Sequence, residues 1–103
     1  MTIVAFTTVY PKPGVKWEDV QKLTEKACDL ARKHGAEKVT VQVTMLGGPA
    51  TNTIGVLASA EDWGRYGKVQ QALLNDPKMQ AVLQEACQLA TWESYVSQTI
   101  SDM

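Results

Sequence analysis

The sequence predicts one α+β domain with the element order β-α-β-β-α-β and a four-stranded antiparallel sheet. Two strand-helix-strand units of similar length follow one another in the 103 residues, which is the split βαβ, or ferredoxin-like, arrangement. Each helical segment has one apolar face, and an antiparallel sheet can bury both on the same side. Hydrophobic residues make up 45% of the chain, enough for one core, so residues 1–103 are expected to form a single domain.

The first strand is expected at residues 2–10. β-Branched and aromatic residues such as Ile3 and Phe6 dominate this segment, and Pro11 and Pro13 then end it. Apolar residues occupy both faces of the predicted strand, a pattern typical of a strand that is covered on both sides.

The first helix is expected over residues 17–34. Glu18 and Asp19 stand in its first turn, basic residues fill its last turn, and Gly35 follows, all of which favour a helix with these ends. Residues at helical spacing are expected to face inward: Val20, Leu23, Thr24, Ala27, Leu30 and Ala31.

A hairpin is expected next. Residues 38–46 alternate strictly between apolar and polar, residues 47–50 form a Gly-Gly-Pro-Ala turn signal, and residues 51–59 read as the partner strand. The second strand therefore has one apolar face and one polar face.

The second helical region is expected in two pieces. A capping box that starts at Ser59 precedes a helix marked by Trp63, Tyr66, Val69 and Leu73. Asp76 and Pro77 then end this helix and start another, as N-cap and first helical residue. The second piece is expected to turn these side chains inward: Met79, Val82, Leu83, Ala86, Leu89 and Ala90. A last strand is expected at residues 93–100.

Charge and composition exclude several classes of function. The net charge of −1 is unlike that of a nucleic-acid binder, and an RNA-binding βαββαβ domain would need paired aromatic residues on the third strand. No apolar run has the ~20 residues that cross a bilayer. Residues 1–6 contain no basic segment or cleavage site, so no signal peptide is expected. Cys28 and Cys87 are expected to be reduced packing residues inside helices, which favours a cytoplasmic protein.

The predicted sheet has one face without a covering element. Both helices belong to the other face, and the uncovered face still carries apolar residues. Exposed apolar patches of this kind usually mark an interface, and a two-fold homodimer is the commonest solution. We therefore expect the chain to pair with a second copy of itself.

The arrangement resembles the dimeric α/β-barrel superfamily, in particular its antibiotic-biosynthesis-monooxygenase-like and NIPSNAP-like small proteins. The resemblance covers the order of elements, the loop at residues 10–14, and the stretch from Ala60 to Met79 with its break at residues 75–77. It implies that two sheets pack face to face as a barrel, and that each subunit keeps a cavity between sheet and helices. It also implies cofactor-independent oxygenases, isomerases, cyclases or haem-degrading enzymes as relatives. His34, the single histidine, lies at a helix end, which departs from the haem-degrading pattern.

His34 and Tyr66 are the candidate catalytic residues. Histidine titrates near neutral pH without help from its surroundings and can act as a general base at a cavity mouth. The competing interpretation of His34 is a cation that stabilises the end of its helix, and that of Tyr66 is an ordinary core aromatic residue.

Trp63, Arg65, Tyr10 and Asn52 are the candidate substrate-binding residues. An aromatic ring beside a guanidinium can bind a flat anionic or carbonyl compound. Trp63 is equally well explained as a core residue and Arg65 as a solvated one. Tyr10 and Asn52 stand on or beside strands, where a polar group can orient a substrate oxygen or serve the sheet alone.

The sequence contains no Gly-rich phosphate loop, paired cysteine motif or acidic cluster, so neither a metal nor a cofactor is expected. The leading hypothesis is a small homodimeric, cofactor-independent enzyme, monooxygenase-like or isomerase-like, that acts on a hydrophobic aromatic or carbonyl compound. The alternative is a non-catalytic dimeric module that binds a small ligand or another protein.

Overall fold

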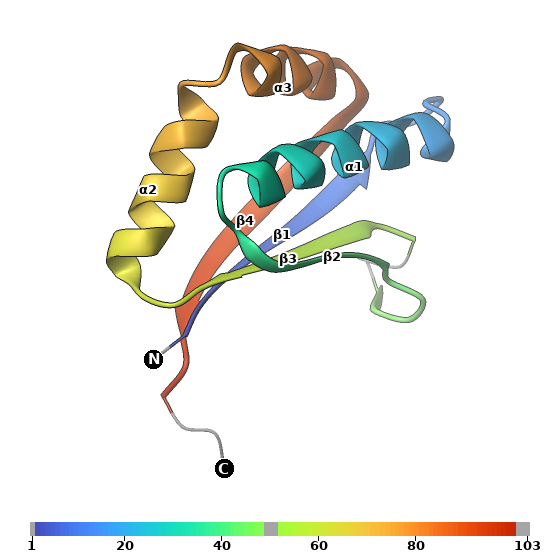
Figure 1. The fold of residues 1–103 in the computed structure, drawn as a ribbon. Helices are drawn as coiled ribbons and strands as arrows, with labels where there is room; N and C mark the ends of the chain where they lie inside the picture. The colour runs from blue at the N-terminus through green and yellow to red at the C-terminus, as the bar shows by residue number, and fades with distance from the viewer. Residues whose placement is uncertain (1, 49–51, 101–103) are drawn as a thin grey trace.

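The computed structural model describes residues 2–48 and 52–100. Its elements follow the predicted order, with the second helical region in two pieces (Figure 1). In chain order they are β1 (Ile3–Pro11), α1 (Trp17–Lys33), β2 (Glu37–Val43), β3 (Ile54–Ala60), α2 (Trp63–Leu74), α3 (Pro77–Leu89) and β4 (Ala90–Gln98).

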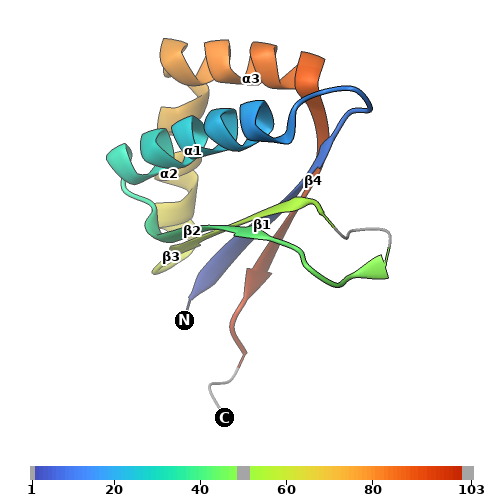
Figure 2. The same ribbon diagram turned by 90° about the vertical axis from the view of Figure 1, so that its right-hand side faces the viewer.

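The four strands form one antiparallel sheet in the order β2-β3-β1-β4. The two strands of the predicted hairpin, β2 and β3, lie on one side of β1, and β4 completes the sheet on the other side. All three helices lie on the same side of the sheet (Figure 2). The predicted α+β, ferredoxin-like fold is therefore confirmed for the single chain.

Alternation along the strands separates the two faces of the sheet. In β1 the odd-numbered residues, such as Thr7 and Val9, face the helices and line the space beneath them. The even-numbered residues, such as Phe6, face the opposite side, where Phe6 is paired across the sheet with Leu57 and Tyr95. No element of the described chain covers this opposite face, which we call the open face (Figure 2).

The core lies at the end of the sheet where β1 runs into α1. Ile54, Val20 and Ala90 are almost completely buried and contact one another there. They come from β3, α1 and β4, so this small cluster holds the first helix against both halves of the sheet.

The break between α2 and α3 forms as the sequence predicts. The carboxylate of Asp76 accepts a hydrogen bond of 2.8 Å from the backbone N–H of Lys78, and Pro77 is the first residue of α3. The predicted capping box at Ser59 is wrong, because Ser59 belongs to β3. Asp62 caps α2 instead, accepting a hydrogen bond of 2.8 Å from the N–H of Arg65.

Several predicted strand ends shift in the structure. β4 begins at Ala90, directly after α3, whereas it was expected at residue 93. Pro11 remains in the sheet as the last residue of β1, where it is paired with Ala90 and its missing N–H costs no ladder bond inside the strand. β2 ends at Val43 and β3 starts at Ile54; the central residues of the predicted turn, 49–51, lie outside the described residues.

Candidate functional site

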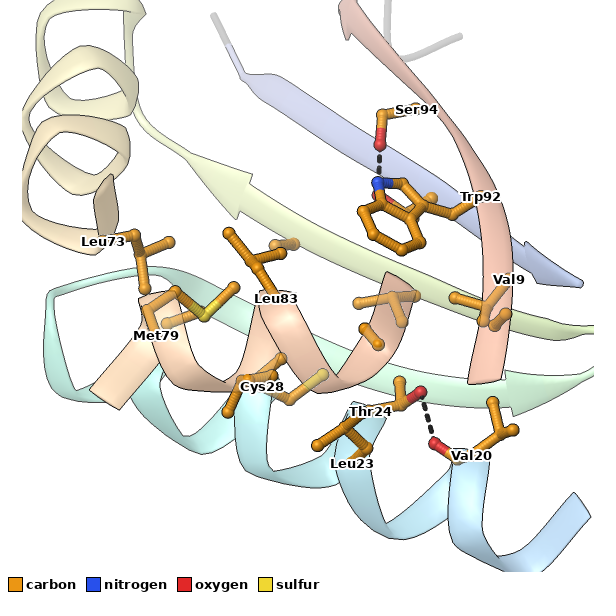
Figure 3. Close-up of a pocket in the computed structure, with 18 of the residues that line it drawn as sticks. Val9, Val20, Leu23, Thr24, Cys28, Leu73, Met79, Leu83, Trp92 and Ser94 are labelled. Atoms are coloured by element: carbon orange, nitrogen blue, oxygen red, sulfur yellow. Dashed lines mark hydrogen bonds between the residues drawn. The ribbon is translucent and has the colours of Figure 1, made fainter. Parts of the chain in front are cut away.

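A cavity of about 250 Å³ lies between the helix-facing side of the sheet and helices α1 and α3 (Figure 3). Pockets for drug-sized ligands usually measure about 300–1,000 Å³, so this cavity suits a small compound. Most of its lining is apolar and includes inward positions predicted for both helical regions: Leu23, Thr24, Ala27, Ala31, Met79, Val82, Leu83, Ala86, Leu89 and Ala90.

Short side chains create this space. Ala27 of α1, Ala58 of β3, and Ala86 of α3 line the cavity with a single methyl group each. Protein cores are normally packed to a density that leaves few voids larger than a water molecule. The alanines on three separate elements therefore leave a volume that larger aliphatic residues would fill.

The polar groups of the cavity gather on β1 and β4. The hydroxyl groups of Thr7 and Ser94 are 2.9 Å apart and share one hydrogen bond. Whichever hydroxyl donates, the hydrogen of the other remains available to a ligand. The hydroxyl of Thr24, by contrast, donates within α1 to the carbonyl of Val20 at 2.8 Å.

Trp92 stands beside this hydroxyl pair. Figure 3 shows its indole ring near Ser94 among the side chains that line the cavity. The residue is 38% exposed, so the ring meets both the cavity and solvent. The indole N–H is a donor only, and it adds a second available donor to the Thr7 and Ser94 hydroxyls.

Cys28 lines the same cavity but is not an activated nucleophile. Burial raises the pKa of its thiol to about 11, and the negative charges of Asp29 and Glu25 act in the same direction against the opposing effect of Arg32. Because the thiolate is the reactive form, the thiol is inert at neutral pH. Cys28 is buried as predicted, whereas Cys87 is exposed and is not the packing residue that was expected.

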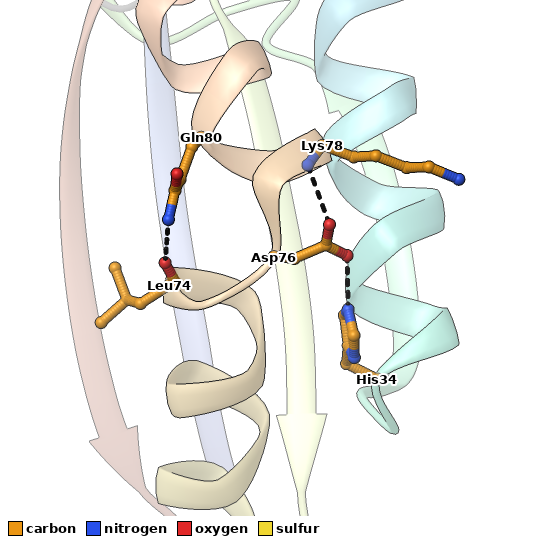
Figure 4. Close-up of polar contacts among 5 residues, drawn as sticks. All are labelled: His34, Leu74, Asp76, Lys78 and Gln80. Carbon is orange, nitrogen blue, oxygen red and sulfur yellow. Dashed lines mark hydrogen bonds and ion pairs between the residues drawn. The ribbon is translucent and has the colours of Figure 1, made fainter.

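His34 does not line the cavity. Its ring nitrogen Nε2 donates a hydrogen bond of 2.7 Å to Oδ2 of Asp76, so the end of α1 is joined to the start of α3 (Figure 4). This contact supports the structural interpretation of His34. Its catalytic role stays a prediction.

Tyr66 and Trp63 lie together on α2, away from the large cavity. Their rings meet edge to face with centroids 5.9 Å apart. Tyr66 lines a smaller pocket of about 60 Å³, whereas Trp63 is half exposed and its N–H donates to the side-chain oxygen of Gln98 at 2.9 Å. Arg65 is exposed, so the predicted aromatic and guanidinium set does not converge on one pocket.

Tyr10 and Asn52 are also outside the cavity. Tyr10 lies on the open face, where burial and the negative charge of Glu93 raise the pKa of its hydroxyl. Tyr95 donates a hydrogen bond of 2.7 Å to Glu93, and this bond raises the pKa of Tyr95. Asn52 is exposed at the end of the hairpin, where its backbone carbonyl accepts a hydrogen bond from the indole of Trp17.

Trp92 was not predicted as a site residue because the last strand was expected to start at residue 93, whereas Ser94 lay inside the predicted strand without being assigned to the cavity. A strand that begins at Ala90 puts Ala90, Trp92 and Ser94 on one face, and the alternation of small and polar residues around Trp92 carries that signal. The misplaced boundary between helix and strand therefore explains why Trp92 was missed.

The Asp76 carboxylate is expected to make the stability of the fold depend on pH. The hydrogen bonds from His34 and from the N–H of Lys78 lower its pKa below the ordinary value of 3.8. A carboxyl with a lowered pKa in the folded state stabilises the fold fully above its unfolded pKa, and this contribution is lost as pH falls through the folded pKa. The stability advantage of the wild type over Asp76→Asn should therefore shrink as pH falls from about 4 to about 2.

Chemical unfolding at a series of pH values measures this difference. Asp76→Ala also removes the helix cap, and is expected to lower the midpoint of thermal unfolding by about 5 °C at pH 7. If the stability advantage of the wild type over Asp76→Asn is unchanged down to pH 2, the charge of the Asp76 carboxylate does not contribute to the stability of the fold.

The described residues offer no metal centre and no membrane span. Among residues 2–48 and 52–100, no three His, Cys, Asp or Glu side chains gather in a way that could hold a metal ion. No helix in the same part of the chain is long and apolar enough to cross a bilayer.

Fold and cavity together define the class of this protein: a ferredoxin-like α+β domain with an apolar cavity between its sheet and its helices. No protein-family model matches the sequence, and no curated protein matches it. Solved structures do match over nearly the whole chain, and they agree with the predicted resemblance to antibiotic-biosynthesis-monooxygenase-like and NIPSNAP-like proteins.

One of these structures is SnoaB, a cofactor-independent oxygenase from Streptomyces nogalater. It has a TM-score of 0.76 and 10% sequence identity, covering 99% of this chain and 96% of SnoaB. An uncharacterised NIPSNAP domain protein from Burkholderia xenovorans has a TM-score of 0.78 and 15% identity, covering 98% and 97% of the two chains. Rv0793 from Mycobacterium tuberculosis has a TM-score of 0.74 and 8% identity, covering 99% and 98%. At these identities the comparison establishes the fold alone.

Proposed function

We propose that this protein binds a small hydrophobic molecule, aromatic or carbonyl-bearing, in the large cavity between the sheet and helices α1 and α3. The observation that carries the proposal is the composition of the cavity: aliphatic walls with a few donors gathered at one place. Ligand pockets are typically of this kind, because apolar walls supply affinity and a few polar groups fix orientation.

The donors favour a carbonyl or a phenol. The indole N–H of Trp92 and one hydroxyl hydrogen of the Thr7–Ser94 pair are both available to an oxygen atom placed between them. An aromatic ring would then occupy the space lined by Leu23 and Leu83. The same donors would stabilise the oxygen more strongly if it carried negative charge.

Catalysis is the second candidate function, and the likeness to SnoaB favours a cofactor-independent oxygenase; an isomerase remains the alternative reaction. In such an oxygenation the electrons that reduce dioxygen come from the substrate, so an electron-rich enolate or phenolate is required. Donors that hold the substrate oxygen as an anion would promote that form. His34 and Tyr66 stay predicted catalytic residues, and His34→Ala and Tyr66→Phe variants with full activity would remove those roles.

We also propose that two copies of the chain pair through the open face. Val4, Phe6 and Leu57 place apolar side chains on this face, and Tyr95 is 56% exposed there. Burying such a surface against an identical one is the commonest way to form a symmetric dimer.

Native mass spectrometry of the purified protein tests both proposals. A dimer that carries a small organic molecule is the expected result, and gentle collisional activation should release that molecule. A bare monomer would contradict the pairing. A dimer that neither carries a ligand nor takes up added aromatic ketones would leave the pairing intact and contradict the binding function.

A further inference from the structure

The smaller pocket, of about 60 Å³, adjoins the large cavity. Three residues line both: Ala31 of α1, Ala58 of β3 and Leu73 of α2. The two spaces therefore adjoin at these three residues.

Of the three boundary residues, Leu73 alone has a side chain longer than a methyl group. Ala31 and Ala58 have no side-chain torsion that could move a carbon atom, whereas Leu73 has two. Figure 3 shows the Leu73 side chain extending from α2 toward the cavity beside Met79. Leu73 is therefore the shared residue whose size and rotamer can change the space between the two pockets.

We propose that Leu73 sets the maximum length of the ligand, and that the smaller pocket is an extension of the same binding site. This inference rests on the proposed binding function of the large cavity. In the wild type the Leu73 side chain stops an elongated ligand at the end of the large cavity. A shorter side chain lets the ligand continue past Ala31 and Ala58.

The lining of the smaller pocket indicates what would enter it. Ala5, Ala36 and Ala60 provide apolar walls, while Tyr66 and Gln70 provide polar groups. The amide of Gln70 donates to the hydroxyl oxygen of Tyr66 at 3.1 Å, so the hydroxyl hydrogen of Tyr66 stays available to an acceptor. The pocket thus suits a narrow unbranched chain, and an acceptor such as a carbonyl at the end of that chain.

The test uses a series of phenyl ketones, from acetophenone to decanophenone, in which the alkyl chain grows by one carbon at a time. Calorimetric titration gives the affinity of each. Affinity should rise about fourfold for each methylene that becomes buried and stop rising at the chain length that fills the cavity. Leu73→Ala should move this limit by about three carbons, the number that the substitution removes from the side chain.

Two further variants show where the additional carbons of the longer alkyl chain lie in Leu73→Ala. Leu83→Ala enlarges the large cavity without touching the smaller pocket. It should change affinity without bringing the end of the alkyl chain within nuclear Overhauser distance of the Tyr66 ring, a contact expected only for Leu73→Ala. Ala36→Val, which narrows the smaller pocket, should return the limit in Leu73→Ala to its wild-type value.

The outcomes separate this inference from the binding function. If the ketones bind the wild type and Leu73→Ala leaves the limit unchanged, the role of Leu73 is overturned and the binding function stands. The role is also overturned if Leu83→Ala produces the same shift and the same contact with Tyr66. If no ketone binds any of the variants or the wild type, both proposals fall together.

Discussion

Ile54→Ala is expected to lower the free energy of unfolding by about 2–5 kcal/mol, the usual cost of truncating a buried Ile or Leu. Ile54 is 1% exposed and contacts Val20 and Ala90, which tie α1 and β4 to the centre of the sheet. Removing three carbons there leaves a void between elements that are distant in the sequence. Urea unfolding at pH 7 measures the loss. The slope of the unfolding free energy against urea concentration should be the same as in the wild type.

Ile100→Ala is the matched control, because the same atoms are removed from a side chain that is 98% exposed. Its effect should stay within about 0.5 kcal/mol. Equal losses for the two variants would mean that Ile54 does not hold the fold together in the way its burial indicates.

Ala86→Phe is expected to reduce the affinity for butyrophenone at least tenfold by filling the large cavity. Ala86 lies on α3 and lines the cavity, so a phenyl ring at this position occupies the space that the ligand needs. A tenfold loss corresponds to about 1.4 kcal/mol, or the burial of roughly two methylene groups. Calorimetric titration measures the affinity, and thermal unfolding shows whether the variant remains folded.

Ala81→Phe provides the control on the same helix. Ala81 is exposed and does not line the cavity, so the added ring should leave ketone binding unchanged. If Ala86→Phe also binds butyrophenone with wild-type affinity, the ligand does not occupy the cavity beneath α3.

Local patterns predicted most of the fold. The helical spacing before Gly35 and the Asp76–Pro77 pair each follow from interactions within a few residues, and both hold in the structure. The alternation predicted over residues 38–46 holds as far as Val43, where β2 ends. The inward faces of the two helical regions were predicted for the same reason, and they supply most of the cavity wall.

The candidate site was harder to predict, because its groups meet through tertiary contacts. His34 and Asp76 are 42 positions apart, and no local pattern shows that the end of one helix meets the start of another. The sequence marked His34 by its chemistry, yet its partner decides what it does. Trp92 was missed for a different reason: its face depends on where β4 begins, and strand ends are set by pairing with β1 as much as by side-chain type.

The most direct test of the binding function is a methyl NMR titration of the wild-type protein with butyrophenone. Saturable shift changes, and contacts with the ketone, are expected at Leu23, Leu83 and Val82, which line the large cavity. The methyl groups of Val4 and Leu57 on the open face should remain unchanged. Saturable shifts confined to Val4 and Leu57, or no saturable shift at all, would contradict ligand binding in the large cavity.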